Sequence, residues 1–441
     1  MTDRKRRVAM NKTIMIVMML LVTGISNAQS PDPTSWRNVF SDPYLARMID
    51  TALVRNTDIR VANLNVVQAE ASLRASRMAF LPSFSLGAEG TVSKAGNSQT
   101  DLSYNFPLSV QWEIDLAGRL REEKRAAESV YWENVELERG VRLQVIAAVA
   151  SHYYTLVMLD EQLDITRQSI ETAKKTVEVM EAMKEVGMQN EAAVSQARTS
   201  LFNISASEKT LLQQIYATEN ALSVLLGERQ SEIPRAKSED TKVNINYTVS
   251  YPLSCLSERP DVKAAEYALT AQMAQVKIAR SAFYPSLTIS ASAGWTNLLG
   301  EVVNPSKMLL NAVGSLLQPL FNKGQNQANL SIAKARQEQA MITFNHSLLV
   351  AGAELCDALN ACKLSAERSE LRRLEVDAAR HAYEVSIELM RNSSSTYLEV
   401  LTAQTALLQS RLSYTVDWMD YMQGHINLYK SLGGNSVSLQ P

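Results

Sequence analysis

The side chains that could do chemistry lie far apart along this chain. The sequence of 441 residues contains four histidines, at His152, His346, His381 and His425. None has a second ligand at the short spacing that metal sites use, and all lie in sequence typical of helices. Isolated histidines of this kind are far more often surface or packing residues than general bases or metal ligands. The pattern therefore gives no catalytic residue and predicts that the protein is not an enzyme.

A group of three methionines is the other candidate for chemistry. Met180, Met183 and Met188 lie close together near the end of a predicted helix. Thioether sulfur is a ligand for soft metals, so the group could handle copper or silver. Methionine is also a common filler of irregular cores, and we favour this packing interpretation. We expect no resident metal and no cofactor.

The first residues are typical of an export signal. Basic residues precede an apolar stretch from Ile14 to Ile25, and Ser26-Asn27-Ala28 supplies the small residues that signal peptidase requires. The apolar stretch is shorter than the roughly 20 residues of a membrane-spanning helix. We expect residues 1–28 to be removed, with Met1 or Met10 as the true start.

Cysteine usage and charge exclude several classes of protein. Cys356 and Cys362 lie six residues apart on a predicted helix, about 9 Å by rise alone, which exceeds the Cα separation of a disulfide. With Cys255 as the third cysteine, no disulfide framework is predicted. No cysteine follows the expected cleavage site as an acceptor for an N-terminal lipid. The formal net charge of −2 argues against a nucleic-acid partner.

The sequence contains two copies of one unit. Residues 58–84 align with residues 261–287 at a constant offset of 203, and Leu226-Gly227 aligns with Leu432-Gly433 at an offset of 206. Such repeats predict two halves of similar shape. We expect a first repeat, an inter-repeat segment, a second repeat and a tail, at residues 29–227, 228–258, 259–433 and 434–441.

Each copy contains a predicted β-hairpin. Apolar and polar residues alternate strictly from Leu102 to Trp112, and the partner strand runs from Ser83 to about Ser93, with a turn at Lys94–Ser98. The second hairpin pairs Ser286–Trp295 with a less regular strand at Met308–Leu320. Strands of about ten residues match those that cross a membrane in a barrel. A half-buried strand of a soluble sheet shows the same alternation, so the pattern alone leaves both interpretations open.

Long helices surround the hairpins. A helix is expected from Tyr44 to Phe80, before the first hairpin. From Arg119 to Glu185 the chain has no proline and one glycine, which predicts a helix of about 100 Å. The chain should turn at Gly187–Asn190 and return as a second helix, and the second copy repeats this arm from Gly324 to about Met390 with a break at Arg391–Thr396. Apolar residues recur every seven positions, which indicates coiled-coil-like packing.

Four strands are too few to close a barrel, for which about eight is the smallest common number. An open sheet edge is not tolerated in lipid, so closure in a membrane would require several chains. The polar strand face carries Ser, Thr, Asn and Gln, which suits a water-filled lumen.

Six motifs of the sequence resemble a known family. They are FSDPYLARMIDTALVRNTDIRVA, TENALSVLLG, LSERPDVKAAE, ARSAFYPSLTISASAGW, YLEVLTAQTALLQSR and INLYKSLGG. Together they are similar to the outer-membrane efflux proteins of the TolC-like group, in the NodT/OprM-type branch. The resemblance covers the chain after the signal segment, in the same order. It implies an α+β membrane channel: a homotrimer with a 12-stranded outer-membrane β-barrel continuous with a 12-helix periplasmic α-barrel.

The resemblance also implies a function. Such proteins are passive ducts in the outer membrane of Gram-negative bacteria, where they contact lipid and dock onto a periplasmic adaptor protein and a proton-driven inner-membrane pump. We expect a multidrug-type efflux duct for drugs or other small toxic solutes. A type I protein-secretion duct and a heavy-metal export duct are alternatives within the family. A periplasmic coiled-coil adaptor or scaffold is an alternative of another class, which would lack the amphipathic strands or carry a single hairpin.

The resemblance places the gate at the narrow periplasmic end, where the two helical arms turn. Related proteins carry an acidic residue in each returning helix, but the matching positions here hold Ala193 and Thr402. Thr405 occupies the position where related proteins often have an arginine. The usual charged latch is thus absent. We expect closure to depend instead on packing and polar contacts, with ordinary solvated turns as the alternative. These contacts would lie near Gln189, Glu191, Tyr397 and Glu399. Together with Thr402 and Thr405, these four residues are the gate candidates.

Overall fold

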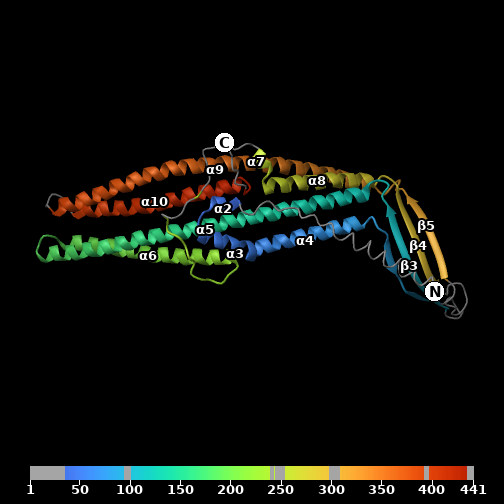
Figure 1. Cartoon of the computed structure of the whole chain (residues 1–441), viewed down its shortest axis with the longest axis horizontal. Helices are drawn as coiled ribbons and strands as arrows, with labels where there is room; N and C mark the ends of the chain where they lie inside the picture. Colours follow the sequence, from blue (N-terminus) through green and yellow to red (C-terminus); the bar gives the residue numbers. More distant parts are fainter. Residues whose placement is uncertain are drawn as a thin grey trace, which may run out of the picture.

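The computed structural model describes residues 35–93, 101–238, 243, 254–296, 308–391 and 397–434. The expected signal segment at 1–28 and the turn at Lys94–Ser98 lie outside these residues, as do positions 392–396 of the break between the second pair of long helices. Long helices form an elongated body with a sheet at one end (Figure 1). The helices are α2 (Ser35–Val39), α3 (Pro43–Arg55), α4 (Thr57–Met78), α5 (Arg119–Glu185), α6 (Glu191–Leu226), α7 (Ser254–Ser257), α8 (Pro260–Ser281), α9 (Gln325–Arg391) and α10 (Tyr397–Ser431).

The two longest helices confirm the prediction of uninterrupted arms. Helices α5 and α9 each contain 67 residues, and α5 has the bounds expected from the sequence. The start of α5 is fixed by Asp115, whose carboxylate accepts hydrogen bonds from the backbone N–H groups of Leu120 and Arg121, both at 3.1 Å. Such bonds satisfy N–H groups that have no partner inside the helix. Gly118 makes the turn before α5 with a φ of +76°, which favours glycine.

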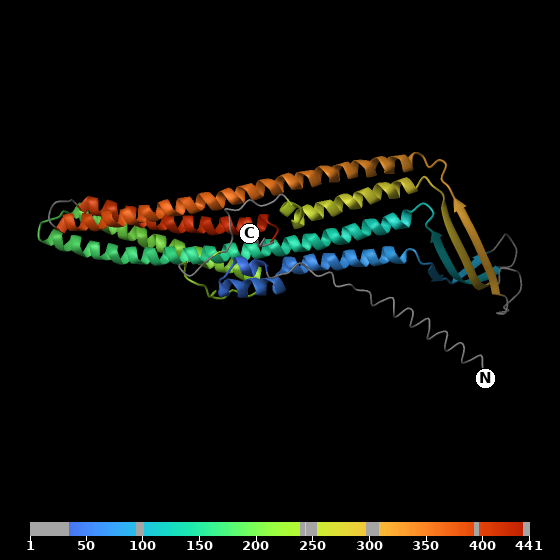
Figure 2. The same cartoon turned by 45° about the horizontal axis from the view of Figure 1, so that its top comes forward.

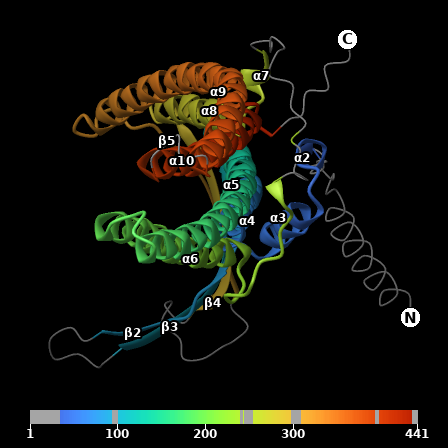
Figure 3. The same cartoon turned by 90° about the vertical axis from the view of Figure 1, so that its left-hand side faces the viewer.

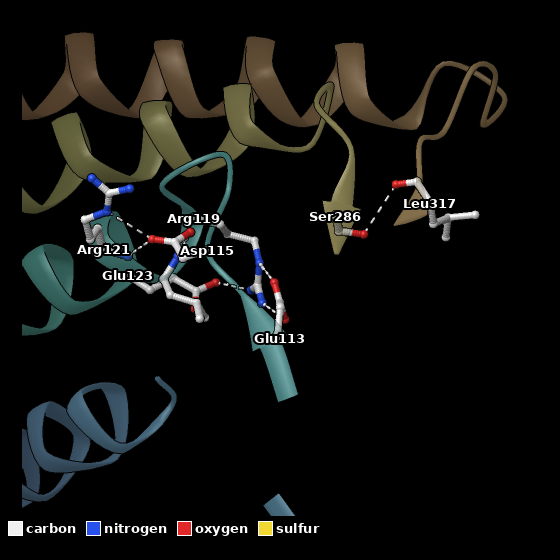
Figure 4. A network of polar contacts seen from close by, with 8 residues as sticks. Glu113, Asp115, Arg119, Arg121, Glu123, Ser286 and Leu317 are labelled. Atoms are coloured by element: carbon white, nitrogen blue, oxygen red, sulfur yellow. Dashed lines mark hydrogen bonds and ion pairs between the residues drawn. The ribbon is translucent and has the colours of Figure 1, made fainter. Parts of the chain in front are cut away.

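Ion pairs connect the first hairpin to α5. The Arg119 guanidinium donates to both carboxylate oxygens of Glu113, at 3.1 and 2.6 Å, and also pairs with Glu123 (Figure 4). A two-point bond between planar groups fixes direction as well as distance. The end of the strand and the first turn of α5 are therefore held at a defined angle.

The helix expected from Tyr44 to Phe80 is two helices, so that prediction was wrong. Helix α3 ends before Asn56 and α4 begins after it. The Asn56 side chain accepts hydrogen bonds from the N–H groups of Asp58 and Ile59, at 2.9 and 3.2 Å. Its amide also donates to the carbonyl of Leu225 on α6 at 2.9 Å. Asparagine is a strong N-cap, and these bonds stabilise a new helix start in place of a continuous helix.

The helices of both repeats form one curved layer. Helix α5 contacts α4 and α6 on one side and α8 and α10 on the other, and α9 packs against α8 and α10. Figure 2 shows α4 and α8 running beside the sheet-proximal halves of the long helices, while α6 and α10 run beside the distal halves. Viewed end-on, α9, α10, α5 and α6 follow an open arc, with α2 and α3 on its convex side (Figure 3). One chain thus forms part of a wall and does not close a ring.

The segment between the repeats packs against this layer. Ile233 is buried, and Arg235 forms ion pairs with Asp160 on α5 and Glu219 on α6. Val243 forms an isolated bridge with Phe40. Residues 228–238 of this segment have little regular structure and lie against α5 and α6.

The strands form one antiparallel sheet. They are β1 (Ser83–Leu86), β2 (Glu89–Ser93), β3 (Asp101–Ile114), β4 (Ser286–Thr296) and β5 (Met308–Leu317). Their order is β1-β3-β4-β5, with β2 also on β3, so that β3 and β4 join the two repeats. The last strand ends three residues earlier than the predicted Leu320. Both hairpins are confirmed.

The strand predicted from Ser83 to Ser93 is interrupted opposite Pro107. Segments β1 and β2 keep the same register on β3, and only residues 87 and 88 leave the ladder. Pro107 accepts a bond from the Gly87 N–H at 2.9 Å but has no N–H of its own to return. The missing donor therefore explains the interruption, and the predicted assignment of faces still holds.

One face of the sheet is apolar and the other is polar. On the apolar face Phe84 lies opposite Val110, which lies opposite Ala291, and Leu108 lies opposite Leu86 and Ala293. On the other face Ser109 lies opposite Ser85 and Ser292. Phe84 and Leu86 are 69% and 80% exposed in the single chain. No helix in the described residues has an apolar stretch long enough to cross a membrane.

The close approach of β3 to Gly294 on β4 predicts an effect of mutation. A Cβ atom on Gly294 would lie 2.5 Å from the Phe106 carbonyl oxygen and 2.8 Å from the Pro107 Cα. We expect Gly294→Ala to cost about 1–3 kcal/mol, the typical cost of overpacking, and to lower the yield of folded protein. Gel mobility with and without heating measures that yield. Gly314→Ala is the matched control, because within one chain a Cβ there meets nothing within 4 Å. Equal yields for the two variants would contradict this account.

Candidate functional site: the tip of the helical arms

The turn between α5 and α6 is built by local hydrogen bonds. Gly187 has a φ of +74°, and the carbonyl of Met183 accepts bonds from the N–H groups of Met188 and Gln189, at 2.8 and 3.2 Å. The Asn190 side chain accepts from the Ala193 N–H at 3.0 Å and caps the start of α6. Gln189 is half-buried within the turn. The turn is therefore well ordered by its own backbone.

Tyr397 joins the second arm to the first. It is the first residue of α10, is only 6% exposed, and packs with Val177 and Met180 of α5. Val194 and Ala197 of α6 complete this buried group, which we call the tip cluster. The aromatic ring thus connects three helices from both repeats. Its hydroxyl is buried and has no hydrogen-bond partner among the described residues, and burial raises its pKa.

The charged residues at the tip stay on the surface. Lys184 pairs with Glu191, and Arg198 pairs with Glu181 at 2.6 Å. The Lys184 ammonium lowers the pKa of the Glu191 carboxyl. Both pairs lie within the first arm, and exposed ion pairs of this kind contribute little to stability because water and salt screen them. They do not connect the two arms.

The remaining gate candidates differ in their surroundings. The hydroxyls of Thr402 and Thr405 donate to carbonyls one turn back in α10, both at 2.8 Å, and both residues are exposed. Glu399 is also exposed. Ala193 is half-buried and packs against the tip cluster. The structure therefore brings Tyr397 into contact with the first arm and leaves the two threonines bonded to their own helix.

Sequence reasoning missed Gln404 as a residue of this region. It is 8% exposed, and its side-chain nitrogen is buried without a partner among the described residues. Gln404 follows Tyr397 by seven residues, so the heptad pattern placed both on one face of α10. A polar residue at an apolar heptad position was the signal that could have identified it.

The methionines and the histidine that are most buried have packing roles. Met180 is 1% exposed in the tip cluster and Met183 packs against it, whereas Met188 is 64% exposed. This confirms packing for Met180 and shows that the three methionines differ in their exposure to solvent.

His425 is 1% exposed, its Nδ1 lies 2.8 Å from the Tyr421 carbonyl oxygen, and burial lowers its pKa. In the described part of the chain, no three His, Cys, Asp or Glu residues lie close enough to hold a metal ion.

Comparison with known proteins agrees with this architecture. The chain is 29% identical to the probable efflux pump outer membrane protein SepC of Pseudomonas putida, over 92% of this chain and 87% of that protein. It is 28% identical to the cation efflux system protein CusC of Escherichia coli K12, over 94% of this chain and 91% of that protein. A crystal structure of CusC matches with a TM-score of 0.84 at 27% identity, covering 93% of this chain and 96% of that one.

A family assignment follows from a match that includes both repeats. The sequence profile described as outer membrane efflux protein matches residues 48–228 and 252–434. These two ranges contain both hairpins of the sheet and all four long helices. The chain belongs to the outer membrane efflux protein family.

Proposed function

We propose that three copies of this chain form a passive duct through the outer membrane and the periplasm. The observation that carries the proposal is the sheet of the single chain, which has two free edges and a continuous apolar face. In the described residues, β1 and β2 form one edge and β5 forms the other. Exposed strand edges are unstable in lipid unless another chain pairs with them. With β1 and β2 counted as one interrupted strand, each chain contributes four strands, and three chains would give the twelve expected for the family.

The helical layer supports the same assembly. Exposed apolar side chains lie on α9, such as Leu349 at 73%, and on the α4 and α6 side, such as Phe202 at 68%. These helices form the two ends of the arc. Apolar patches of this kind mark interaction surfaces, and joining unlike ends by rotation closes a ring. Three arcs would form a tunnel of twelve helical columns below the barrel.

The partners and the cargo are also part of the proposal. A duct without an energy source needs a pump, so we propose docking of the helical tips onto a periplasmic adaptor and an inner-membrane pump. We propose drugs or other small toxic solutes as cargo, because the chain is similar to an efflux pump outer membrane protein of Pseudomonas putida. Cation export is the second candidate, because the chain is similar over nearly its full length to a cation efflux protein.

For the gate, we propose that packing of Tyr397 replaces the charged latch of related proteins. Tyr397 is the gate candidate that contacts the other arm, through the tip cluster. Opening the narrow end would draw α9 and α10 away from α5 and α6 and expose this cluster. Gln189, Glu191, Glu399, Thr402 and Thr405 would then shape the aperture through their polar side chains, with a smaller effect on the closed state.

A deletion strain tests this function. Loss of the gene is expected to raise sensitivity to toluene and to several dyes or antibiotics, and a plasmid copy should restore growth. Sensitivity to copper or silver alone would establish the cation alternative and overturn the solute proposal. The parent strain should express the chain and lack related ducts. If deletion of the gene in that strain left sensitivity to all of these compounds unchanged, a role in efflux would be contradicted.

A further inference from the structure

A pocket lies where the two repeats meet, well away from the tip cluster. Its volume is about 370 Å³, and its walls come from α5, α9, α10 and the segment between the repeats. Ile165 on α5, Val376 on α9 and Trp418 on α10 contribute apolar surface. This volume is at the low end of the range for small-molecule sites, which combine apolar walls with a few polar groups.

The polar groups of this pocket are dominated by arginine. Arg373, Arg380 and Arg411 line it, together with the two carboxylates of Glu161 and Asp377. Asp377 is shared, because it lies 3.4 Å from Arg373 and 3.5 Å from Arg380. Arg373 also donates to both carboxylate oxygens of Glu370, at 3.0 and 2.7 Å, so its charge is already paired.

Arg411 differs from the other two pocket arginines in its partners. Its guanidinium donates to the side-chain oxygen of Gln168 at 3.1 Å, and among the described residues no carboxylate forms an ion pair with it. Burial lowers its pKa; the nearby carboxylate of Glu161 opposes this effect and the charge of Arg380 adds to it. Unpaired donors on a partly buried guanidinium are costly, and an anion in the pocket would accept hydrogen bonds from them.

Contacts between helices hold the pocket wall next to Arg411. The amide of Gln162 on α5 donates to the Thr415 hydroxyl on α10 at 2.9 Å, and Trp418 packs edge-on against Tyr154 at a ring distance of 6.1 Å. Ser238 donates to Glu161 at 3.1 Å. A site held by such contacts loses little conformational entropy when a ligand binds.

We propose that this pocket binds a small organic anion with an apolar body, such as an aromatic carboxylate. The carboxylate would accept hydrogen bonds from the free guanidinium donors of Arg411, while the ring would lie against Val376, Ile165 and Trp418. Guanidinium and carboxylate groups match in geometry, which gives such a pair direction as well as strength. Because the walls come from both repeats, a bound anion would also hold the two arms together.

The test is a ¹⁹F NMR titration of the full mature chain in lipid nanodiscs with 4-fluorobenzoate. We expect saturable binding to the unchanged protein and a loss of affinity of about tenfold or more for Arg411→Gln, the usual scale for a lost hydrogen bond between charged groups. Arg380→Gln is a second variant and should also weaken binding. Neutral 4-fluorobenzyl alcohol should bind more weakly than the acid.

Arg336→Gln is the matched control, because it removes one exposed arginine from α9 outside the pocket. It should leave the affinity unchanged. The proposal is overturned if the unchanged protein shows no saturable binding, if Arg411→Gln binds as well as the unchanged protein, or if the alcohol binds as tightly as the acid. Binding is measured without any transport, so either result is independent of the proposed efflux function.

Discussion

Replacing Tyr397 with alanine is expected to open the narrow end of the duct and to raise its single-channel conductance. The ring is 6% exposed and contacts α5 and α6 in the tip cluster. Truncating a buried aromatic side chain costs about 3–5 kcal/mol of packing. A shift of about 1.4 kcal/mol already changes an equilibrium tenfold, so the closed state should lose most of its population. Planar-bilayer recording of the purified protein measures the change.

Two further changes at the tip separate packing from polarity. Tyr397→Phe should leave the conductance unchanged, because the hydroxyl has no hydrogen-bond partner among the described residues. Alanine at Glu191 should have little effect, because the exposed pair with Lys184 lies within one arm. If Tyr397→Phe opened the channel as much as Tyr397→Ala, a polar contact would be the latch. If Tyr397→Ala conducted like the unchanged protein, Tyr397 would have no gating role.

Replacing Arg235 with methionine is expected to destabilise the middle of the molecule by about 3 kcal/mol. Arg235 donates to Glu219 at 2.6 Å and to Asp160 at 2.8 Å, and it fixes the inter-repeat segment against α5 and α6. Glu219 is only 8% exposed, so the variant leaves a buried carboxylate without its cation. Breaking a buried pair costs about 3–5 kcal/mol, and the lower value applies because Asp160 is partly exposed.

The melting temperature of the detergent-solubilised protein measures this loss. Arg55→Met is the matched control, because Arg55 pairs with Glu228 at the surface, where both side chains are largely exposed. The control should change stability by less than about 1 kcal/mol. A fall in melting temperature no larger for Arg235→Met than for Arg55→Met would show that the buried network contributes little.

The regular elements could be predicted from the sequence because their signals are local. Helix α5 follows from 67 residues without proline, and the faces of β3 follow from strict alternation. The break at Asn56 was missed because asparagine is tolerated within helices, and only its bonds to α4 and α6 show that it ends one. The interruption opposite Pro107 depends on strand register, which the sequence does not state.

The site was harder to predict than the fold because it depends on contacts between repeats. Tyr397 and Glu399 were equal candidates by position, but only Tyr397 lies in the tip cluster. The pocket around Arg411 joins side chains more than 200 residues apart, such as Ile165 and Trp418. No spacing rule connects such residues, since their contact is set by how α5 packs against α10.

The number of chains in the assembled protein tests the central claim most directly. Native mass spectrometry of the protein, extracted from outer membranes in mild detergent, should give a mass of three mature chains. In the described part of each chain, two sheet edges and the two ends of a helical arc are available for pairing, and three copies would pair them all. A folded single chain that stays monodisperse in buffer without detergent would contradict the account.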